Sequence, residues 1–121
     1  MDIINNAANT LDNIIMGYND PIDVMTFLDH FDQHKATVLD VRGQAESQPF
    51  LEKYGERWIN IPQPELAKRF TELAKVENMC LICDTGPRSY EAQLFLKAHG
   101  IANTRNIQGG YGMLRKSNPD F

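Results

Sequence analysis

Residues 83–89, Cys-Asp-Thr-Gly-Pro-Arg-Ser, combine a nucleophile with residue types that could activate it. They follow the apolar run 79–82, which predicts a buried strand, and they precede a helical pattern. A thiol at such a junction lies beside backbone N–H groups without intrahelical partners, and these groups and the helix dipole favour its thiolate. Gly86 allows a tight loop, and Arg88 adds positive charge. The pattern predicts that Cys83 attacks an electrophilic sulfur or phosphorus atom.

The remaining cysteine and two of the histidines predict no second reactive site. Cys80 and Cys83 match a C-x-x-C pattern, but residues three apart on a strand point to opposite faces and lie roughly 10 Å apart. That separation is too large for a disulfide, so we expect Cys80 in the core. His30 and His34 have helical spacing but no evident third ligand, which favours a solvated helix end over a metal site.

Composition excludes several classes of protein. The chain has 121 residues, of which 42% are hydrophobic and 23% charged, as expected for one soluble domain. No apolar run approaches the roughly 20 residues of a membrane span, and the start of the chain lacks the basic region of a secretory signal. Two cysteines make no disulfide framework, so we expect a cytoplasmic protein. A net charge of −4 with scattered basic residues predicts no nucleic-acid binding.

Strand and helix patterns alternate along the chain. Apolar runs predict strands at 37–41, 58–61, 79–83 and 104–107. Periodic patterns predict helices at 64–75 and 88–99, and a short helix or coil after the glycine pair at 109–110. This alternation favours an α/β domain with a mostly parallel sheet, in which functional loops follow the carboxyl ends of strands.

Two further segments have weaker patterns. Asp20 as N-cap and Pro21 at the first helical position predict a helix. Its apolar side would consist of Ile22, Met25, Phe27, Leu28 and Phe31. Residues 43–57 predict a polar loop with one helical turn near 50–54.

The first 19 residues predict a separate helical extension. Their apolar side chains fall on one helical stripe, formed by Ile4, Ala8, Leu11 and Ile15. This helix would either pack on the domain at 20–121 or contact a second copy as a homodimer.

Four stretches, in order, resemble the single-domain rhodanese family. They are the cysteine loop 83–89, Leu-Asp-Val-Arg at 39–42, Ile-Asn-Ile-Pro at 59–62 with Glu-Leu at 65–66, and Asn-Ile-Gln-Gly-Gly-Tyr at 106–111. The resemblance covers about 21–113. It implies a rhodanese-like fold for residues 20–121, with a central, mostly parallel sheet of about five strands and helices on both faces.

The resemblance also implies a sulfurtransferase. Cys83 would take sulfane sulfur from a small donor as a persulfide and pass it to a thiol, a protein acceptor or another nucleophile. The implied substrate contacts are Asp84, Thr85, Gly86, Pro87 and Arg88, and the implied supporting residues are Asp40, Arg42 and Ser89. Neither a metal nor an organic cofactor is implied.

The loop residues narrow the choice of donor. Asp84 repels an anionic donor and destabilises the Cys83 thiolate, and Pro87 lacks the backbone N–H group that another residue would offer to the sulfur. Among persulfides, polysulfides and thiosulfate, we therefore expect a persulfide on a small thiol or protein to be preferred over free thiosulfate.

Two alternatives stay open: a non-catalytic rhodanese-like module that binds a partner, and a cysteine-dependent phosphatase or arsenate reductase. The latter enzymes typically have a longer loop than the four residues between Cys83 and Arg88.

Overall fold

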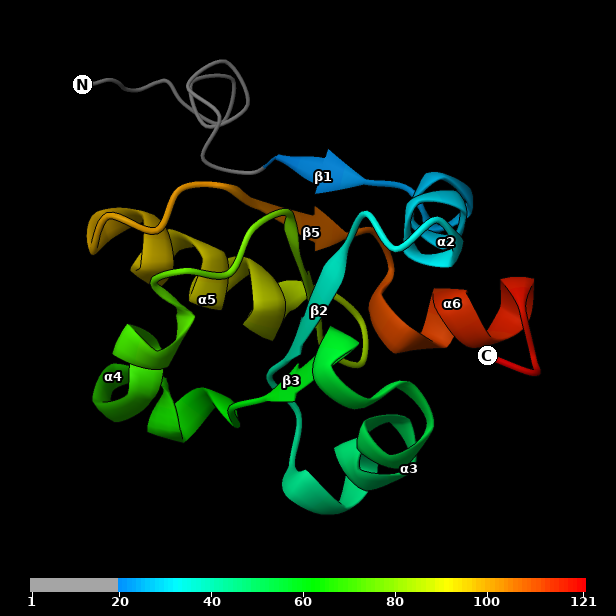
Figure 1. Cartoon of the computed structure of the whole chain (residues 1–121), viewed down its shortest axis with the longest axis horizontal. Helices are drawn as coiled ribbons and strands as arrows, with labels where there is room; N and C mark the ends of the chain where they lie inside the picture. Colours follow the sequence, from blue (N-terminus) through cyan, green and yellow to red (C-terminus); the bar gives the residue numbers. More distant parts are fainter. Residues whose placement is uncertain (1–19) are drawn as a thin grey trace.

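A computed structural model of the chain describes residues 20–121 (Figure 1). Its sheet has five parallel strands in the order β1-β5-β4-β2-β3. The strands are β1 Pro21–Ile22, β2 Thr37–Asp40, β3 Trp58–Asn60, β4 Met79–Ile82 and β5 Thr104–Ile107. The predicted extension at 1–19, and with it the predicted dimer contact, lies outside the described residues.

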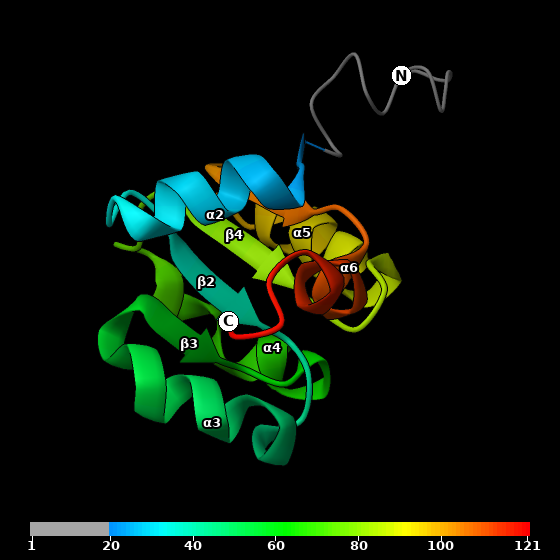
Figure 2. The ribbon, with the colours of Figure 1, turned by 90° about the vertical axis from the view of Figure 1, so that its right-hand side faces the viewer.

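Helices cover both faces of this sheet (Figures 1 and 2). The α-helices are α2 Val24–Asp32, α3 Gln44–Tyr54, α4 Leu66–Arg69, α5 Pro87–Ala98 and α6 Gly110–Ser117. Short 3-10 turns occupy Gly55–Arg57, Gln63–Glu65 and Phe70–Leu73. One face packs against α2, α3 and α6, and the other against α4 and α5. The predicted α/β fold is confirmed, and within residues 20–121 no helix has the length and apolarity to cross a membrane.

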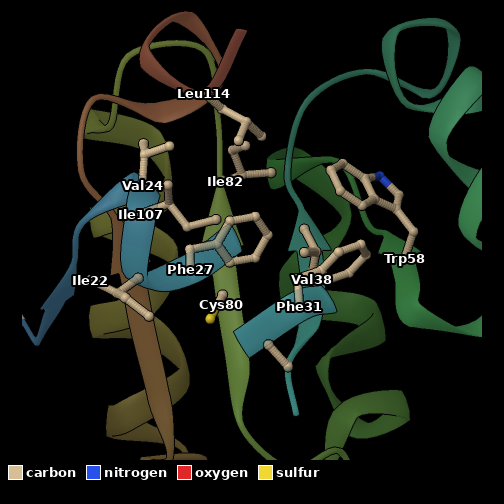
Figure 3. Close-up of a cluster of buried hydrophobic side chains, with 11 residues drawn as sticks. Ile22, Val24, Phe27, Phe31, Val38, Trp58, Cys80, Ile82, Ile107 and Leu114 are labelled. Carbon is tan, nitrogen blue, oxygen red and sulfur yellow. The ribbon is translucent and has the colours of Figure 1, made fainter. Parts of the chain in front are cut away.

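Each face of the sheet has its own hydrophobic core, because side chains alternate along a strand. Cys80 and Ile82 point into the core under α2 and α6, which also holds several aromatic rings (Figure 3). Leu81 and Cys83 belong to the other core, under α4 and α5. The two cysteines are therefore free thiols on opposite faces, as the strand pattern predicted.

The predicted helix start at Asp20 and Pro21 is wrong. This segment forms the edge strand β1, which pairs in parallel with β5. The Gln108 N–H group, for example, donates to the Ile22 carbonyl at 3.0 Å. Helix α2 begins after Asp23, whose side chain caps it. Pairing with a distant strand therefore overrides a local capping signal.

Three other expectations also differ from the structure. Residues 43–57 contain the 11-residue helix α3 where the pattern predicted a single turn. At its start the Gly43 N–H group donates to Glu46 Oε1 at 3.2 Å, a local cap that stabilises the first turn. The predicted helix 64–75 is divided into α4 and two 3-10 turns. Met25, expected on the apolar side of its helix, is 67% exposed.

Candidate active site

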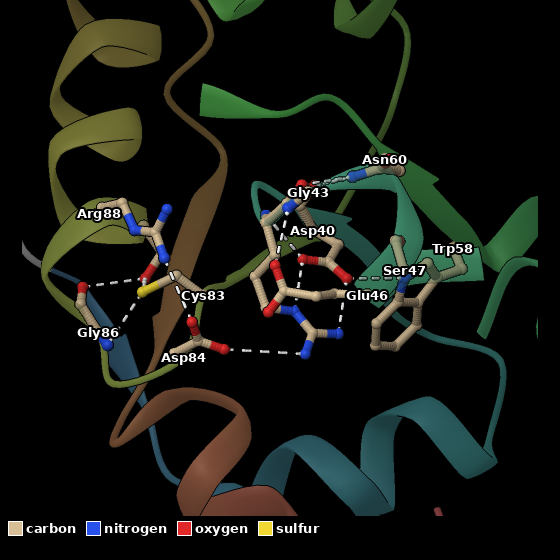
Figure 4. Close-up of polar contacts among 12 residues, drawn as sticks. Asp40, Gly43, Glu46, Ser47, Trp58, Asn60, Cys83, Asp84, Gly86 and Arg88 are labelled. Carbon is tan, nitrogen blue, oxygen red and sulfur yellow. Dashed lines mark hydrogen bonds and ion pairs between the residues drawn. The ribbon is translucent and has the colours of Figure 1, made fainter. Parts of the chain in front are cut away.

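Cys83 lies where β4 ends and a short loop leads into α5 (Figure 4). Gly86 has a φ of +119°, a left-handed conformation that favours glycine. This conformation directs the Gly86 N–H group to Cys83 Sγ at 3.0 Å. Cys83 as a residue is buried, at 1% exposed. The loop therefore holds the sulfur among peptide hydrogens, as the sequence pattern predicted.

Two opposing influences set the pKa of the Cys83 thiol. Burial is the largest and by itself raises the pKa. The Ser89 hydroxyl, at 3.4 Å from Sγ, and backbone N–H groups of Ser89, Gly86 and Thr85 together outweigh burial and lower it. These donors favour the thiolate, which is the nucleophilic form. Burial raises the pKa of Cys80 to about 11, so that thiol stays protonated.

The two thiols should differ strongly in reactivity. At neutral pH we expect iodoacetamide to alkylate Cys83 much faster than Cys80, whose thiolate fraction is about 100-fold below that of an unperturbed thiol. Because its pKa is lowered, the rate at Cys83 should rise with pH through a midpoint below that of an ordinary cysteine. Peptide mass spectrometry of the folded protein over a pH series measures both. Equal labelling of the two thiols, or a midpoint above the ordinary value, would contradict this geometry.

The amino-terminal turn of α6 holds the loop from the other side. The Tyr111 and Gly112 N–H groups donate to the carbonyls of Cys83 and Asp84 at 2.7 and 3.0 Å. Gly110 makes this approach possible, because a Cβ atom there would lie 2.5 Å from the Cys83 carbonyl oxygen. These bonds turn the Cys83 and Asp84 carbonyls toward α6. The two carbonyl oxygens therefore do not face the Cys83 sulfur. The glycine pair predicted as a turn thus fixes the orientation of the cysteine loop.

A buried ion pair stands at the neighbouring strand end. β2 lies beside β4, with Asp40 in register with Ile82. Arg42 Nε and Nη2 donate to the two Asp40 carboxylate oxygens at 3.0 and 2.9 Å. Trp58 Nε1 donates to the same carboxylate at 3.2 Å. The carboxylate is thus held by a guanidinium and an indole, and the pair lies beside the cysteine loop.

The Asp84 carboxylate links the Asp40–Arg42 ion pair to α5. Arg88 Nη2 lies 3.2 Å from one Asp84 oxygen, and Arg42 Nη1 lies 3.9 Å from the other (Figure 4). The Asp84 and Arg88 side chains are half-exposed, whereas Arg42 is buried. Each guanidinium beside the loop therefore faces a carboxylate, and neither offers an unbalanced positive charge to an incoming ligand.

The structure brings the sequence-predicted site residues together at one edge of the sheet. Thr85 contributes its backbone, and Pro87 occupies the first turn of α5. Sequence reasoning assigned no site role to Trp58, which contacts the ion pair, or to Asn106, whose Oδ1 accepts a bond from Ser89 Oγ at 2.6 Å. The rhodanese-like stretch at 106–111 includes Asn106, but no spacing signal distinguishes this residue.

These features define a class of proteins: parallel α/β domains that hold a cysteine in the loop between a strand and the start of a helix. Within that class, the family model for the rhodanese-like domain matches residues 23–115. The chain belongs to the rhodanese-like domain family.

Solved structures show the same relationship. A rhodanese-related protein from Thermoplasma volcanium is 28% identical, with a TM-score of 0.69 over 82% of this chain and 93% of that one. An NAD-dependent persulfide reductase from A. fulgidus is 29% identical, with a TM-score of 0.63 over 84% of this chain but 17% of that one. The human single-domain sulfurtransferase TSTD1 is 20% identical, with a TM-score of 0.65 over 81% and 96% of the two chains, a likeness in fold alone. No curated protein matches the chain.

Proposed function

We propose that this protein is a sulfurtransferase that carries sulfane sulfur as a persulfide on Cys83. The observation that supports it most is the Gly86 N–H group at 3.0 Å from Sγ, accompanied by the Ser89 hydroxyl at 3.4 Å. Hydrogen-bond donors arranged around a thiol stabilise negative charge on sulfur. They would serve the thiolate before transfer and the charged persulfide after it.

The proposed reaction has two displacements at sulfur. The Cys83 thiolate attacks the outer sulfur of a donor persulfide, a new S–S bond forms, and the donor thiolate leaves with the electron pair of the old bond. The thiolate of an acceptor then attacks the outer sulfur on Cys83, and the Cys83 thiolate leaves. Sulfur is passed on without net oxidation of the protein. The residues of this chain therefore need only stabilise negative charge on sulfur and position the reacting sulfur atoms.

The short loop favours sulfur transfer over phosphoryl transfer. Four residues separate Cys83 from Arg88, and the N–H groups of this ring converge on a single sulfur atom. A phosphoryl group would present three equatorial oxygens to the same ring. We expect no hydrolysis of an aryl phosphate, and turnover of that substrate would favour the phosphatase alternative.

Mass spectrometry tests the proposal directly. Treatment with glutathione persulfide or a polysulfide should add the mass of one sulfur atom to the Cys83 peptide, because this thiol is the ionised one. The Cys80 peptide should stay unchanged, and dithiothreitol should remove the added sulfur. The Cys83→Ser variant provides the matched control. A wild-type protein that keeps its mass under these conditions would be a non-catalytic partner-binding module instead.

The paired charges beside the loop support a donor with less negative charge than thiosulfate. Asp84 faces Arg88 and Arg42, so an anion such as thiosulfate meets a carboxylate as well as a guanidinium. The persulfide group of a small thiol or a protein carries at most one negative charge, whereas thiosulfate carries two. The persulfide reductase among the similar structures supports the same substrate class. The two free thiols fit a reducing, cytoplasmic compartment.

Removing the Asp84 charge should change this preference. In Asp84→Asn we expect kcat/KM for thiosulfate, relative to glutathione persulfide, to rise roughly three- to tenfold, the effect of one charge at close range near the surface. Glu77→Gln removes the same charge from the exposed residues just before β4, at the far end of the sheet, and should leave the ratio unchanged. An unchanged ratio in Asp84→Asn would show that this carboxylate does not select the donor.

A further inference from the structure

The Ser89 hydroxyl has more acceptors within reach than it has protons. Its oxygen is 2.6 Å from Asn106 Oδ1, 3.0 Å from the Gly86 carbonyl oxygen and 3.4 Å from Cys83 Sγ. Ser89 is fully buried, so water does not supply a second donor. A hydroxyl carries one proton, and therefore only one of these three acceptors can hold it at a time.

The register of the sheet explains why Asn106 lies beside this hydroxyl. Asn106 is in β5, where it pairs with Leu81 of β4. Partners in register on adjacent strands point to the same face, and Leu81 belongs to the core under α5. The Asn106 side chain therefore points toward α5, which carries Ser89 in its first turn.

The orientation of the Asn106 carboxamide follows from its second contact. Asn106 Nδ2 lies 3.5 Å from the Gly86 carbonyl oxygen, which is an acceptor only. The amino group therefore faces Gly86, and the carbonyl oxygen faces Ser89. In this orientation Oδ1 is the nearest acceptor for the Ser89 proton, and it is nearer than the sulfur by a wide margin.

We propose that Asn106 is a positioning residue whose side-chain carbonyl competes with Cys83 Sγ for the single Ser89 proton and so limits ionisation of the thiol. With the proton on the Asn106 side, the sulfur keeps only its backbone donors. With the proton turned to Sγ, the thiolate gains one more hydrogen bond. When a persulfide forms, charge moves to the outer sulfur and the proton can return to Asn106. The hydroxyl thus donates to Sγ in the thiolate, and to Asn106 in the thiol and in the persulfide.

This inference rests on the proposed role of Cys83, but its test measures ionisation of the thiol and not sulfur transfer. The pKa of Cys83 is obtained from the ultraviolet absorbance of its thiolate, as the difference from the same protein with Cys83→Ser. Asn106→Ala removes the nearer of the two competing acceptors and leaves the Gly86 carbonyl oxygen at 3.0 Å from the hydroxyl. It should therefore lower that pKa by up to about 1, the full effect of one gained hydrogen bond. Asn106→Asp keeps the shape, holds the proton more strongly and adds negative charge, so it should raise the pKa by at least as much.

The Ser89→Ala background separates this competition from other effects. Without the hydroxyl, Asn106→Ala should leave the pKa of Cys83 unchanged, and Asn106→Asp should keep only the part due to its charge. All variants retain the ionisable groups around the loop, which come from the loop itself, α5, the end of β2 and α6: Asp84, Arg88, Asp40, Arg42 and Tyr111.

Thermal unfolding of each variant shows whether the fold is retained. A residue with a merely structural role would change the melting temperature without opposite pKa shifts in the two Asn106 variants. An unchanged or raised pKa in folded Asn106→Ala would overturn the proposal. The same decrease in the Ser89→Ala background would overturn it as well. Either result leaves the persulfide experiment on Cys83 untouched, so the two proposals can fail separately.

Discussion

Cys83→Ser should reduce sulfur transfer by roughly three orders of magnitude or more, the scale on which loss of a covalent nucleophile acts. A serine hydroxyl stays protonated near neutral pH and forms no persulfide, although the N–H groups of the loop still face it. The measurement is kcat/KM with glutathione persulfide as donor and a small thiol as acceptor. The loss should be as large for a polysulfide donor, because both substrates require the same attacking sulfur.

Cys80→Ala is the matched control for this experiment. It also removes a buried thiol from β4, but from the opposite face of the sheet, where the pKa of the thiol is raised to about 11. Transfer should stay close to the wild-type rate. If the Cys83→Ser variant retained transfer while Cys80→Ala lost it, the assignment of the nucleophile would be wrong.

Arg42→Met should lower the free energy of unfolding by about 3–5 kcal/mol. Methionine retains an apolar stem but removes both bonds to the fully buried Asp40 carboxylate. That carboxylate would then keep the Trp58 indole and a backbone N–H group as its donors, with no positive charge. The guanidinium also lies 4.5 Å from the centre of the Tyr111 ring, so its loss should loosen the contact between α6 and the cysteine loop. Urea denaturation monitored by Trp58 fluorescence measures the change.

Two comparisons isolate the buried pair. Arg69→Met removes a guanidinium that pairs with Glu65 and Glu72 on the exposed side of α4, and its effect should be far smaller. The double variant Asp40→Asn with Arg42→Met removes both charges and should be less destabilised than the sum of the single variants. Additive losses in this double variant would show that the two side chains do not stabilise each other.

Elements whose signals are local could be predicted from the sequence. The strand at 79–82 is an apolar run because a central parallel strand is buried on both faces. The cysteine loop is contiguous, so the order of its residues already predicted a thiol surrounded by peptide N–H groups. The opposite orientations of Cys80 and Cys83 followed from the two-residue period of a strand. These features are set by residues that are adjacent in the sequence, so contacts with distant segments change them little.

Other features depend on tertiary pairing. The Pro21 segment carries a helix-start signal but becomes a strand, because β5 supplies its hydrogen-bond partners from the other end of the domain. The Asp84 carboxylate meets Arg42 only because β2 and β4 are neighbours in the sheet, and Asn106 reaches Ser89 only through the register of β5. The sequence by itself determined the loop and the position of the Cys83 thiol between a strand and a helix. The tertiary structure decided which charges and hydrogen bonds surround that loop, since these groups are far apart along the chain and only strand order and register bring them together.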